Sequence, residues 1–206
     1  RCTSSAASDV YKRQGLDGED MIPLGKNLKY FGDGYQIAKR IDKKRFWRIP
    51  VMDGEFMCEE MTARIPAIGG GNFLLLSKNR SSCLLACELA VNVMSKIDNI
   101  ITPFPGGVVR SGSKVGSKYK ALIASTNDAF CPSLSGITGS KLHKSVNCVM
   151  EIVINGLTKE DIDKGIRESL VAISKSKYKK DIVSVSAGNY GGKLGQHHFH
   201  LRKILK

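Results

Sequence analysis

A strand followed by an amphipathic helix occurs twice in this sequence, and this repeated order is the feature that most limits the possible folds. The first unit has an apolar run at residues 72–76 and a helical pattern over residues 81–98. The second has an alternating strand at residues 146–154, a helix that begins after Thr158, and a further strand at residues 181–187. Two such units predict an α/β (α+β) sandwich with both helices on one face of a mainly antiparallel sheet, as in the split βαβ arrangement. The other face of the sheet is then left for a ligand or a partner.

Both predicted helices carry one apolar face, formed by residues that recur at three- and four-residue spacing. On the first helix these are Ala86, Leu89, Ala90, Val93 and Ile97, and on the second they are Ile162, Ile166, Leu170 and Ile173. Thr158 is expected to cap the second helix, where Glu160 and Asp161 in the first turn suit the helix dipole. The glycines at residues 69–71 precede the first predicted strand, and the turn at residues 77–82 between strand and helix has none. A nucleotide phosphate loop is therefore not favoured.

A different pattern fills residues 29–56, where short apolar or aromatic runs are separated by Gly-Asp-Gly, Asp-Lys-Lys and Asp-Gly. This predicts two or three short strands joined by tight turns. Phe46 and Trp47 are expected to be core anchors. Residues 1–14 have neither a helical nor a strand period, and we expect them to be a leader that is not native, with a flexible native linker as the alternative.

The chain is strongly basic, with 32 basic and 19 acidic residues and a net charge of +13. The electric field of a protein with this much positive charge attracts anionic partners. The basic residues form no long arginine-rich run and do not interleave with aromatic residues, so no nucleic-acid partner is expected, although a basic nucleic-acid-binding module remains one alternative. Multiply anionic small coenzymes fit the charge equally well.

The composition, with 42% hydrophobic and 25% charged residues, is that of a globular protein. No apolar run approaches the roughly 20 residues that a membrane helix requires, and we expect a cytoplasmic protein with no membrane partner. The six cysteines are scattered without a C-x-x-C pair. They are expected to be reduced and to act as small hydrophobic residues, including Cys83 and Cys87, which could share one helix face.

The strand at residues 146–155 carries a carboxylate on its polar face. Alternation places Val146, Cys148, Met150, Ile152 and Ile154 on an apolar face that should meet the helices. Glu151 lies on the opposite face between Asn147 and Asn155. A carboxylate at mid-strand is costly if it is buried for stability alone, so Glu151 is a candidate general acid or base whose pKa partial burial would raise. The alternative is that Glu151 pairs with a lysine or faces water.

Two loops rich in glycine, residues 101–120 and 186–200, are candidates for ligand binding. Glycines let backbone N–H groups approach a ligand closely, and Lys114, Lys118 and Lys193 add positive charge for carboxylates or phosphates. The same glycines could equally be simple turn residues.

Histidine and cysteine side chains suggest two further kinds of site, neither of which is favoured. His197, His198 and His200 raise a zinc hypothesis, and the last two would share a face of a strand, but no fourth ligand and no H-E-x-x-H helix is present. We therefore expect no metal, and contact of these histidines with a substrate or a carboxylate instead. Cys131 and Ser133 lie in a loop, yet there is no G-x-S-x-G elbow and no histidine placed beside them.

Six segments occur in a characteristic order: YFGDGY, ITPFPGG, SGSK, FCPS, EIVINGL and SAGNYGGKLGQHHFH. From about residue 29 to residue 205 the chain thereby resembles the formylmethanofuran:tetrahydromethanopterin formyltransferase family. The resemblance implies two related lobes of ferredoxin-like plan, a homotetramer built as a dimer of dimers, and a ligand cleft near the lobe and subunit contacts. It also implies transfer of a formyl group from formylmethanofuran to a ring nitrogen of tetrahydromethanopterin, a step of one-carbon metabolism and of methanogenesis. Both are anionic carrier coenzymes that act as substrates, and no metal or covalently bound cofactor is implied.

The resemblance also assigns roles to residues. Glu151, in EIVINGL, matches the expected acid/base of the family. The loops at residues 103–118 and 188–200 would hold the two carriers together, so that proximity supplies much of the acceleration. The expected binding residues are Pro103, Phe104, Pro105, Gly106, Gly107, Ser111, Gly112, Ser113, Lys114, Lys118, Asn155, Gly188, Asn189, Tyr190, Gly191, Lys193, His197 and His198.

Compared with the family pattern, we expect roughly the first third, most of the N-terminal lobe, to be missing from this sequence. The expected organisation is a leader at residues 1–14, the remnant of an N-terminal lobe at residues 15–60, and a C-terminal ferredoxin-like lobe at residues 61–206. One alternative within the same fold is a non-catalytic, coenzyme-binding component of a larger formyltransferase/hydrolase complex. Such a component would bind the coenzymes but turn over slowly when alone.

Overall fold

The computed structural model describes residues 17–188 and 195–206. The chain forms two compact units, Arg1–Pro66 and Ala67–Lys206. The leader expected at residues 1–14 lies outside the described residues. Within the described part of the chain, no helix has the length and apolar character needed to cross a membrane.

The first unit contains the predicted short strands. A three-stranded antiparallel sheet has the order β2-β3-β4. The turn between β2 and β3 uses Asp42 and Lys43, whose φ angles of 47° and 68° lie in the left-handed region. The prediction of two or three strands joined by tight turns is confirmed. The elements of this unit are β1 (Met21–Ile22), α1 (Leu24–Leu28), a 3₁₀ turn (Lys29–Gly32), β2 (Ile37–Ile41), β3 (Lys44–Val51), β4 (Gly54–Glu59) and β5 (Thr62–Ala63).

The core of the first unit is small. Phe46, Ile49, Met57 and Cys58 are buried, so Phe46 is a core anchor as predicted. Trp47 is only partly buried, and the ammonium group of Lys29 lies 4.4 Å from the centroid of its ring. A cation at this distance from an indole face is attracted by the ring quadrupole.

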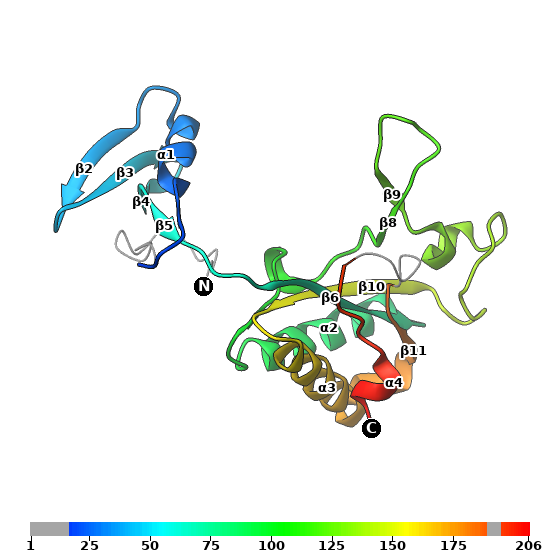
Figure 1. Cartoon of the computed structure of the whole chain (residues 1–206). Helices are drawn as coiled ribbons and strands as arrows, with labels where there is room; N and C mark the ends of the chain where they lie inside the picture. The colour runs from blue at the N-terminus through cyan, green and yellow to red at the C-terminus, as the bar shows by residue number, and fades with distance from the viewer. Residues whose placement is uncertain (1–16, 189–194) are drawn as a thin grey trace. The chain divides into compact units, whose positions relative to one another are not determined.

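The second unit is built on a four-stranded antiparallel sheet in the order β11-β6-β10-β7. Figure 1 labels three of its strands, β6, β10 and β11. Its strands are β6 (Ile68–Ser77), β7 (Ile100–Ile101), β10 (Cys148–Gly156) and β11 (Ile182–Ser186). The two long strands β6 and β10 are central and pair along almost their full length, with Glu151 opposite Leu74 and Val153 opposite Asn72. A separate hairpin, β8 (Ser113–Val115) and β9 (Ala124–Thr126), lies outside this sheet.

The glycines at residues 69–71 lie within β6, although the sequence placed them before the strand. A glycine makes the same ladder hydrogen bonds as any other residue, and at Gly71 it also makes room for a helix. A Cβ atom built at Gly71 would lie 2.9 Å from Cγ2 of Ile162. The strand therefore begins earlier than its apolar run, because the backbone pairing does not need apolar side chains.

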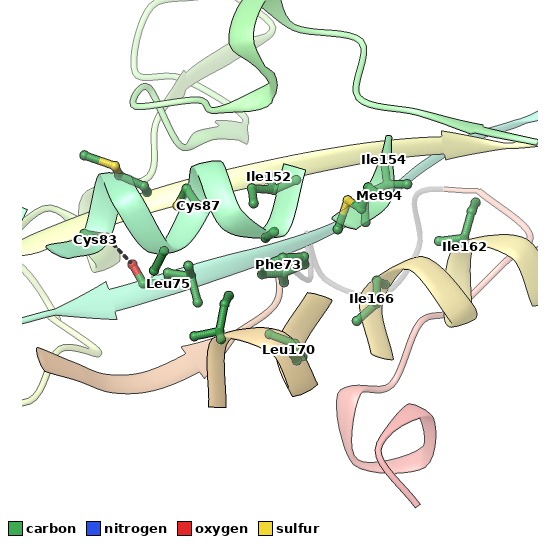
Figure 2. Close-up of a cluster of buried hydrophobic side chains, with 14 of the residues drawn as sticks. Phe73, Leu75, Cys83, Cys87, Met94, Ile152, Ile154, Ile162, Ile166 and Leu170 are labelled. Carbon is green, nitrogen blue, oxygen red and sulfur yellow. Dashed lines mark hydrogen bonds between the residues drawn. The ribbon is translucent and has the colours of Figure 1, made fainter. Parts of the chain in front are cut away.

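Helices α2 (Arg80–Met94) and α3 (Lys159–Lys175) cover one face of this sheet (Figure 1). Side chains from both helices and from β6 and β10 form one apolar cluster, which includes Phe73, Leu75, Ile152, Ile154, Ile162 and Ile166 (Figure 2). The predicted apolar face of α3 is confirmed, and Thr158 caps the helix by accepting a hydrogen bond from the backbone N–H of Asp161. Full burial of such side chains typically contributes about 1.5–3 kcal/mol each.

Helix α2 differs from its prediction in length and in face. It ends at Met94, four residues earlier than expected, and its buried residues are Cys83, Ala86, Cys87, Ala90 and Met94. Leu89 and Val93 are partly buried, and Ile97 is buried although it follows the helix. The two cysteines extend the apolar face because a reduced thiol buries as a small hydrophobe. All cysteines of the described residues are free.

The opposite face of the sheet is only partly open. Leu74, Leu76 and Val146 form a second cluster with Phe130 and Val149. The remaining elements are short: 3₁₀ turns at Pro105–Gly107, Asp128–Phe130, Pro132–Leu134 and Lys177–Asp181, and α4 (Leu201–Ile204). The cluster covers part of this face, and Glu151 and Asn72 lie on another part.

Candidate functional site

Glu151 lies in the middle of β10 on the face opposite the helices, as predicted. It is only 4% exposed. The side-chain amide of Asn72, from the neighbouring strand β6, donates a hydrogen bond of 2.5 Å to Oε1 of Glu151. The amide oxygen of Asn72 accepts a 2.9 Å hydrogen bond from the backbone N–H of Gly188. Because the amide oxygen of Asn72 accepts from Gly188, the amide nitrogen is the end that faces Glu151 and donates to its carboxylate.

Burial raises the pKa of the Glu151 carboxyl, and the hydrogen bond from Asn72 acts in the opposite direction with a smaller effect. Burial favours the neutral acid because the charged form loses its hydration. The alternative of an exposed glutamate is wrong, since Glu151 is buried. None of the described lysines forms an ion pair with it. A carboxyl with a raised pKa can exchange a proton closer to neutral pH.

The backbone around Glu151 is held on both sides. On one side β6 pairs with β10, and on the other the backbone of Val109 exchanges hydrogen bonds of 2.8 and 2.9 Å with Glu151. After β7 the chain passes through the turn Pro105–Gly107 and then reaches Val109. Glu151 is thus an interior position with little freedom to move, which suits a group that must meet a reacting atom at a fixed distance.

Two cavities meet at Glu151. The first, of about 420 Å³, is lined by Glu151, Asn72 and Gly188 together with His197 and His198. The second, of about 330 Å³, is lined by Glu151 together with Ser111 and Gly112, which come shortly after Val109 in the sequence. Glu151, Gly188, His197, His198, Ser111 and Gly112 were all predicted site residues, and the structure brings them to these two cavities.

The comparisons with known proteins identify the family. The family described as "FTR, proximal lobe" matches residues 54–204, and the family described as "Formylmethanofuran-tetrahydromethanopterin formyltransferase" matches residues 2–51. The chain belongs to the formylmethanofuran-tetrahydromethanopterin formyltransferase family. The second match starts inside residues 1–14, and the non-native leader stays a prediction.

Two relatives named formylmethanofuran–tetrahydromethanopterin formyltransferase are each 60% identical to this chain. The one from Methylobacillus flagellatus matches over 89% of this chain and 61% of its own length. The one from Methylococcus capsulatus matches over 92% of this chain and 63% of its own length. This member of the formyltransferase family therefore spans about three fifths of the length of these curated relatives.

Two solved structures share the fold. One is the formyltransferase/hydrolase complex from Methylorubrum extorquens in complex with methylofuran, which is 46% identical with a TM-score of 0.70 over 93% of this chain and 64% of that chain. The other is the formylmethanofuran:tetrahydromethanopterin formyltransferase from Methanosarcina barkeri, which is 39% identical with a TM-score of 0.67 over 91% of this chain and 63% of that chain.

Other predicted binding residues of this formyltransferase family member do not reach the two cavities beside Glu151. Lys114 is paired with Asp128 and lines a third cavity of about 390 Å³, which Gly188 also borders. Lys118 is exposed on the hairpin and lines a different cavity. Pro103, Phe104, Pro105, Gly106, Gly107, Ser113 and Asn155 are not among the residues that line either cavity at Glu151. Asn189, Tyr190, Gly191 and Lys193 lie outside the described residues.

The glycines of the turn Pro105–Gly107 have a structural role. Gly106 and Gly107 have φ angles of 67° and 73°. Gly107 is buried, and a Cβ atom built there would lie 2.6 Å from Cγ2 of Val91 on α2. Gly107 therefore lets the loop pass close to the helix. For this glycine, the structure supports a role in the turn, which was one of the two roles that the sequence left open.

The histidines are arranged differently from the prediction. Residues 197–200 have no regular secondary structure, so His198 and His200 do not share a strand face. Their ring centroids lie 6.3 Å apart. Among the described residues, no group of three or more histidine, cysteine, aspartate or glutamate side chains could hold a metal ion.

Sequence reasoning missed Asn72, Arg80 and Arg110, which line the cavities at Glu151. Asn72 could have been found from alternation, because it is the one polar residue of the run at residues 72–76 and shares the face of Leu74. Arg80 comes shortly after the end of β6, and Arg110 comes after the loop that contains Pro105–Gly107. Their positions in the sequence do not indicate that they line the same cavity. Only the pairing of Val109 with Glu151 brings Arg110 to this face.

Proposed function

We propose that this chain carries the acid/base residue of a formyltransferase that moves a formyl group between formylmethanofuran and a ring nitrogen of tetrahydromethanopterin. The observation that carries the proposal is the buried carboxyl of Glu151, with a raised pKa, at the meeting point of two cavities. Family membership supports the reaction class. Because the chain spans about three fifths of its curated relatives, the activity is proposed for the whole protein.

In the proposed reaction, the ring nitrogen of the pterin attacks the formyl carbon and forms a tetrahedral adduct. The carboxylate of Glu151 accepts the proton that the attacking nitrogen loses. When the adduct collapses, the bond between the formyl carbon and the methanofuran nitrogen breaks, and the protonated Glu151 returns the proton to the departing amine. One proton is taken and one is given back, so the enzyme is unchanged at the end. A carboxyl of raised pKa suits both transfers.

Asn72 supports this chemistry by holding one carboxyl oxygen. Its amide donates to Oε1 of Glu151, which leaves Oε2 as the oxygen proposed to exchange the proton. The donor stabilises the charged form, and it counteracts part of the rise in pKa that burial causes. Asn72 is a positioning residue in this proposal, because it acts through Glu151.

The two carriers are proposed to lie in the two cavities, so that their reacting atoms meet at Glu151. His197, His198 and Gly188 would contact one carrier, and Ser111 and Gly112 the other. The remaining predicted binding residues, including Lys114, Lys118 and those at residues 189–193, are proposed to contact the more distant parts of the carriers. Bringing two bound substrates together supplies a large part of the acceleration in such transfers. The proposal requires no resident metal or cofactor.

Several finer features are part of the same proposal. The strand order β11-β6-β10-β7, with one helix after each of β6 and β10, supports a ferredoxin-like plan for the second unit. The first unit is proposed to belong to an N-terminal lobe, with the lobe boundary near the expected residue 60. The whole protein is proposed to act in the cytoplasm as a dimer of dimers, in one-carbon metabolism such as methanogenesis.

A second candidate is a coenzyme-binding component that is active only in a larger complex. It is favoured by a 46% identical relative from Methylorubrum extorquens, whose name places it in a formyltransferase/hydrolase complex. The two candidates share a fold and differ in what the protein does alone.

One experiment tests the proposed function and separates these candidates. The full-length protein that contains this chain is purified alone and mixed with formylmethanofuran and tetrahydromethanopterin, and the formylated pterin is followed by its absorbance and by mass spectrometry. Saturable turnover supports the transferase. Binding of both coenzymes without turnover supports the component of a larger complex, and binding of neither coenzyme contradicts both.

A further inference from the structure

The second cavity at Glu151 carries two arginines that have no partner among the described residues. Arg80 and Arg110 both line it. Neither forms an ion pair or a hydrogen bond with any described residue. By contrast, Arg48 is paired with Glu55, and Arg167 donates to the backbone carbonyl of Ile204. Two guanidinium groups at one cavity repel one another unless an anion lies between them.

The backbone that carries each arginine is held in place. Arg80 begins α2, where the side chain of Asn79 accepts from the N–H of Ser82, and the amide of Asn147 donates to the carbonyl of Lys78. Arg110 directly follows Val109, whose N–H and C=O are both bonded to the backbone of Glu151. The two arginines therefore come from two fixed backbone segments that line the cavity, which lowers the entropy lost when they bind a ligand.

The surroundings favour an anion over a cation. Glu151 is the one acidic residue among the described residues that line this cavity, and its Oε1 is held by Asn72. Asp128 lies next to the cavity residue Asn127, but it is already paired with Lys114. Burial raises the pKa of the nearby Cys148 thiol to about 11, and the charges of Arg80 and Arg110 act against that rise. Both positive charges thus act on the same region of the cavity.

Leu74, Phe130 and Val149 form an apolar part of the lining, beside polar residues that include Asn127 and Asn147. We propose that Arg80 and Arg110 form a subsite for a carboxylate or phosphate group attached to a partly apolar body, in the same cavity that Glu151 lines. The planar guanidinium group matches either anion through paired hydrogen bonds. The further assignment of this anion to one of the carrier coenzymes rests on the proposed function.

The subsite is tested with simple anions, so that the result does not depend on turnover. Glutarate and inorganic phosphate are titrated separately into the protein by calorimetry at low salt, and the measurement is repeated with Arg80→Gln, Arg110→Gln and the double variant. Each single variant is expected to bind the preferred anion about tenfold more weakly, because it loses a charge-assisted hydrogen bond to the anion. A preference for glutarate assigns a carboxylate, and a preference for phosphate assigns a phosphate.

Arg40→Gln is the matched control, since Arg40 is an exposed arginine of β2 without a partner among the described residues. Arg110→Lys keeps the charge but loses the planar fork, and it is expected to fall between the wild type and Arg110→Gln. Equal binding of both anions to all variants, or no binding of either, overturns the subsite. A uniform loss in every variant including Arg40→Gln overturns it as well, because it shows general attraction to a basic protein.

The link to the carriers has a separate readout. In the full-length protein, Arg80→Gln and Arg110→Gln should raise the KM of one carrier about tenfold and leave kcat nearly unchanged. If anions bind through these arginines while neither KM changes, the subsite stands and its assignment to a carrier is wrong. If the wild-type protein transfers no formyl group, the proposed function fails, and the calorimetry still decides whether the subsite exists.

Discussion

The two faces of the four-stranded sheet are assembled in different ways. The face beneath α2 and α3 uses residues that repeat within single elements, such as Ile162 and Ile166 of α3 or Ile152 and Ile154 of β10. The opposite face combines single residues from separate segments: Glu151 from β10, Asn72 from β6 and the backbone of Gly188. One face buries apolar groups, which stabilises the fold, and the other buries a carboxyl, which costs stability. We therefore expect substitutions on the apolar face to change mainly the stability of the protein, and substitutions on the polar face to change mainly its activity.

The largest expected effect is on the polar face. Glu151→Gln keeps the shape of the side chain and its hydrogen bond with Asn72, but it cannot exchange a proton. In the full-length enzyme kcat should fall by about 10²–10⁴-fold, with little change in coenzyme affinity, because general acid–base catalysis contributes on that scale. Steady-state kinetics measures this, with the exposed Glu160→Gln as the control. Retention of more than about a third of wild-type kcat would remove Glu151 from the mechanism.

The same variant should not be less stable than the wild type, and its stability should depend less on pH. The pKa of Glu151 is raised in the folded protein, so the folded state holds the proton at pH values where the unfolded state has lost it. The unfolding free energy of the wild type therefore falls as pH rises from the ordinary glutamate pKa toward the folded pKa. Urea unfolding across this window should show a flatter profile for Glu151→Gln.

The next effect belongs to the apolar face. Ile152 is next to Glu151 in sequence, is fully buried and points toward the helices. Ile152→Ala should lower the unfolding free energy by about 2–5 kcal/mol, since it leaves a cavity in a packed core. Val153→Ala, on the polar face, should cost less because Val153 is only partly buried. Urea unfolding of both variants measures the difference, and equal losses would contradict the separation of the two faces.

The apolar face was largely predictable from the sequence, because periodicity within one element determines it. The face of α3, its cap at Thr158 and the alternation from Cys148 to Ile154 follow from neighbouring residues and are confirmed. The prediction for Val146 is wrong, because β10 begins at Cys148 and Val146 packs with Leu74 and Leu76 in the cluster on the opposite face. The strand β6 and helix α2 were placed correctly, but their ends were not. Gly71 belongs to the strand because its backbone pairs with Ile154 of β10, and that is a contact between distant segments.

The polar face was predictable only at Glu151. Its carboxylate interrupts an apolar strand, and that signal lies within the strand itself. The hydrogen bond from Asn72 depends on the register of β6 against β10, and the approach of Arg110 depends on the bridge between Val109 and Glu151. Both the register and the bridge are pairings between segments that lie far apart in the sequence. The resemblance to the family selected loops near these positions, and it did not identify Asn72, Arg80 or Arg110.

A smaller effect is expected where the loop passes over α2 at the edge between the two faces. Gly106→Ala and Gly107→Ala both place a side chain at positive φ, which costs about 1–2 kcal/mol. At Gly107 the new methyl group would also meet Val91, whereas at Gly106 nothing lies within 4 Å. Gly107→Ala should therefore lose about 1–3 kcal/mol more than Gly106→Ala, by overpacking. Thermal unfolding of the pair measures this difference, and equal losses would show that the loop adjusts freely.

The smallest effect is a shift, along the pH axis, of one limb of the plot of kcat/KM against pH. This shift tests how Asn72 acts on Glu151. In Asn72→Ala the carboxyl loses the donor that lowers its pKa, while the burial that raises the pKa remains. The limb of the kcat/KM profile that reports Glu151 should therefore move to higher pH, because that profile follows the free enzyme. The exposed Asn92→Ala on α2 is the control for general effects of removing an amide. Asn72→Ala also leaves the N–H of Gly188 without its acceptor, so some stability is lost as well. A purely structural role for Asn72 predicts that loss with an unmoved limb, and a limb that moves to lower pH would show that another group sets the pKa of Glu151.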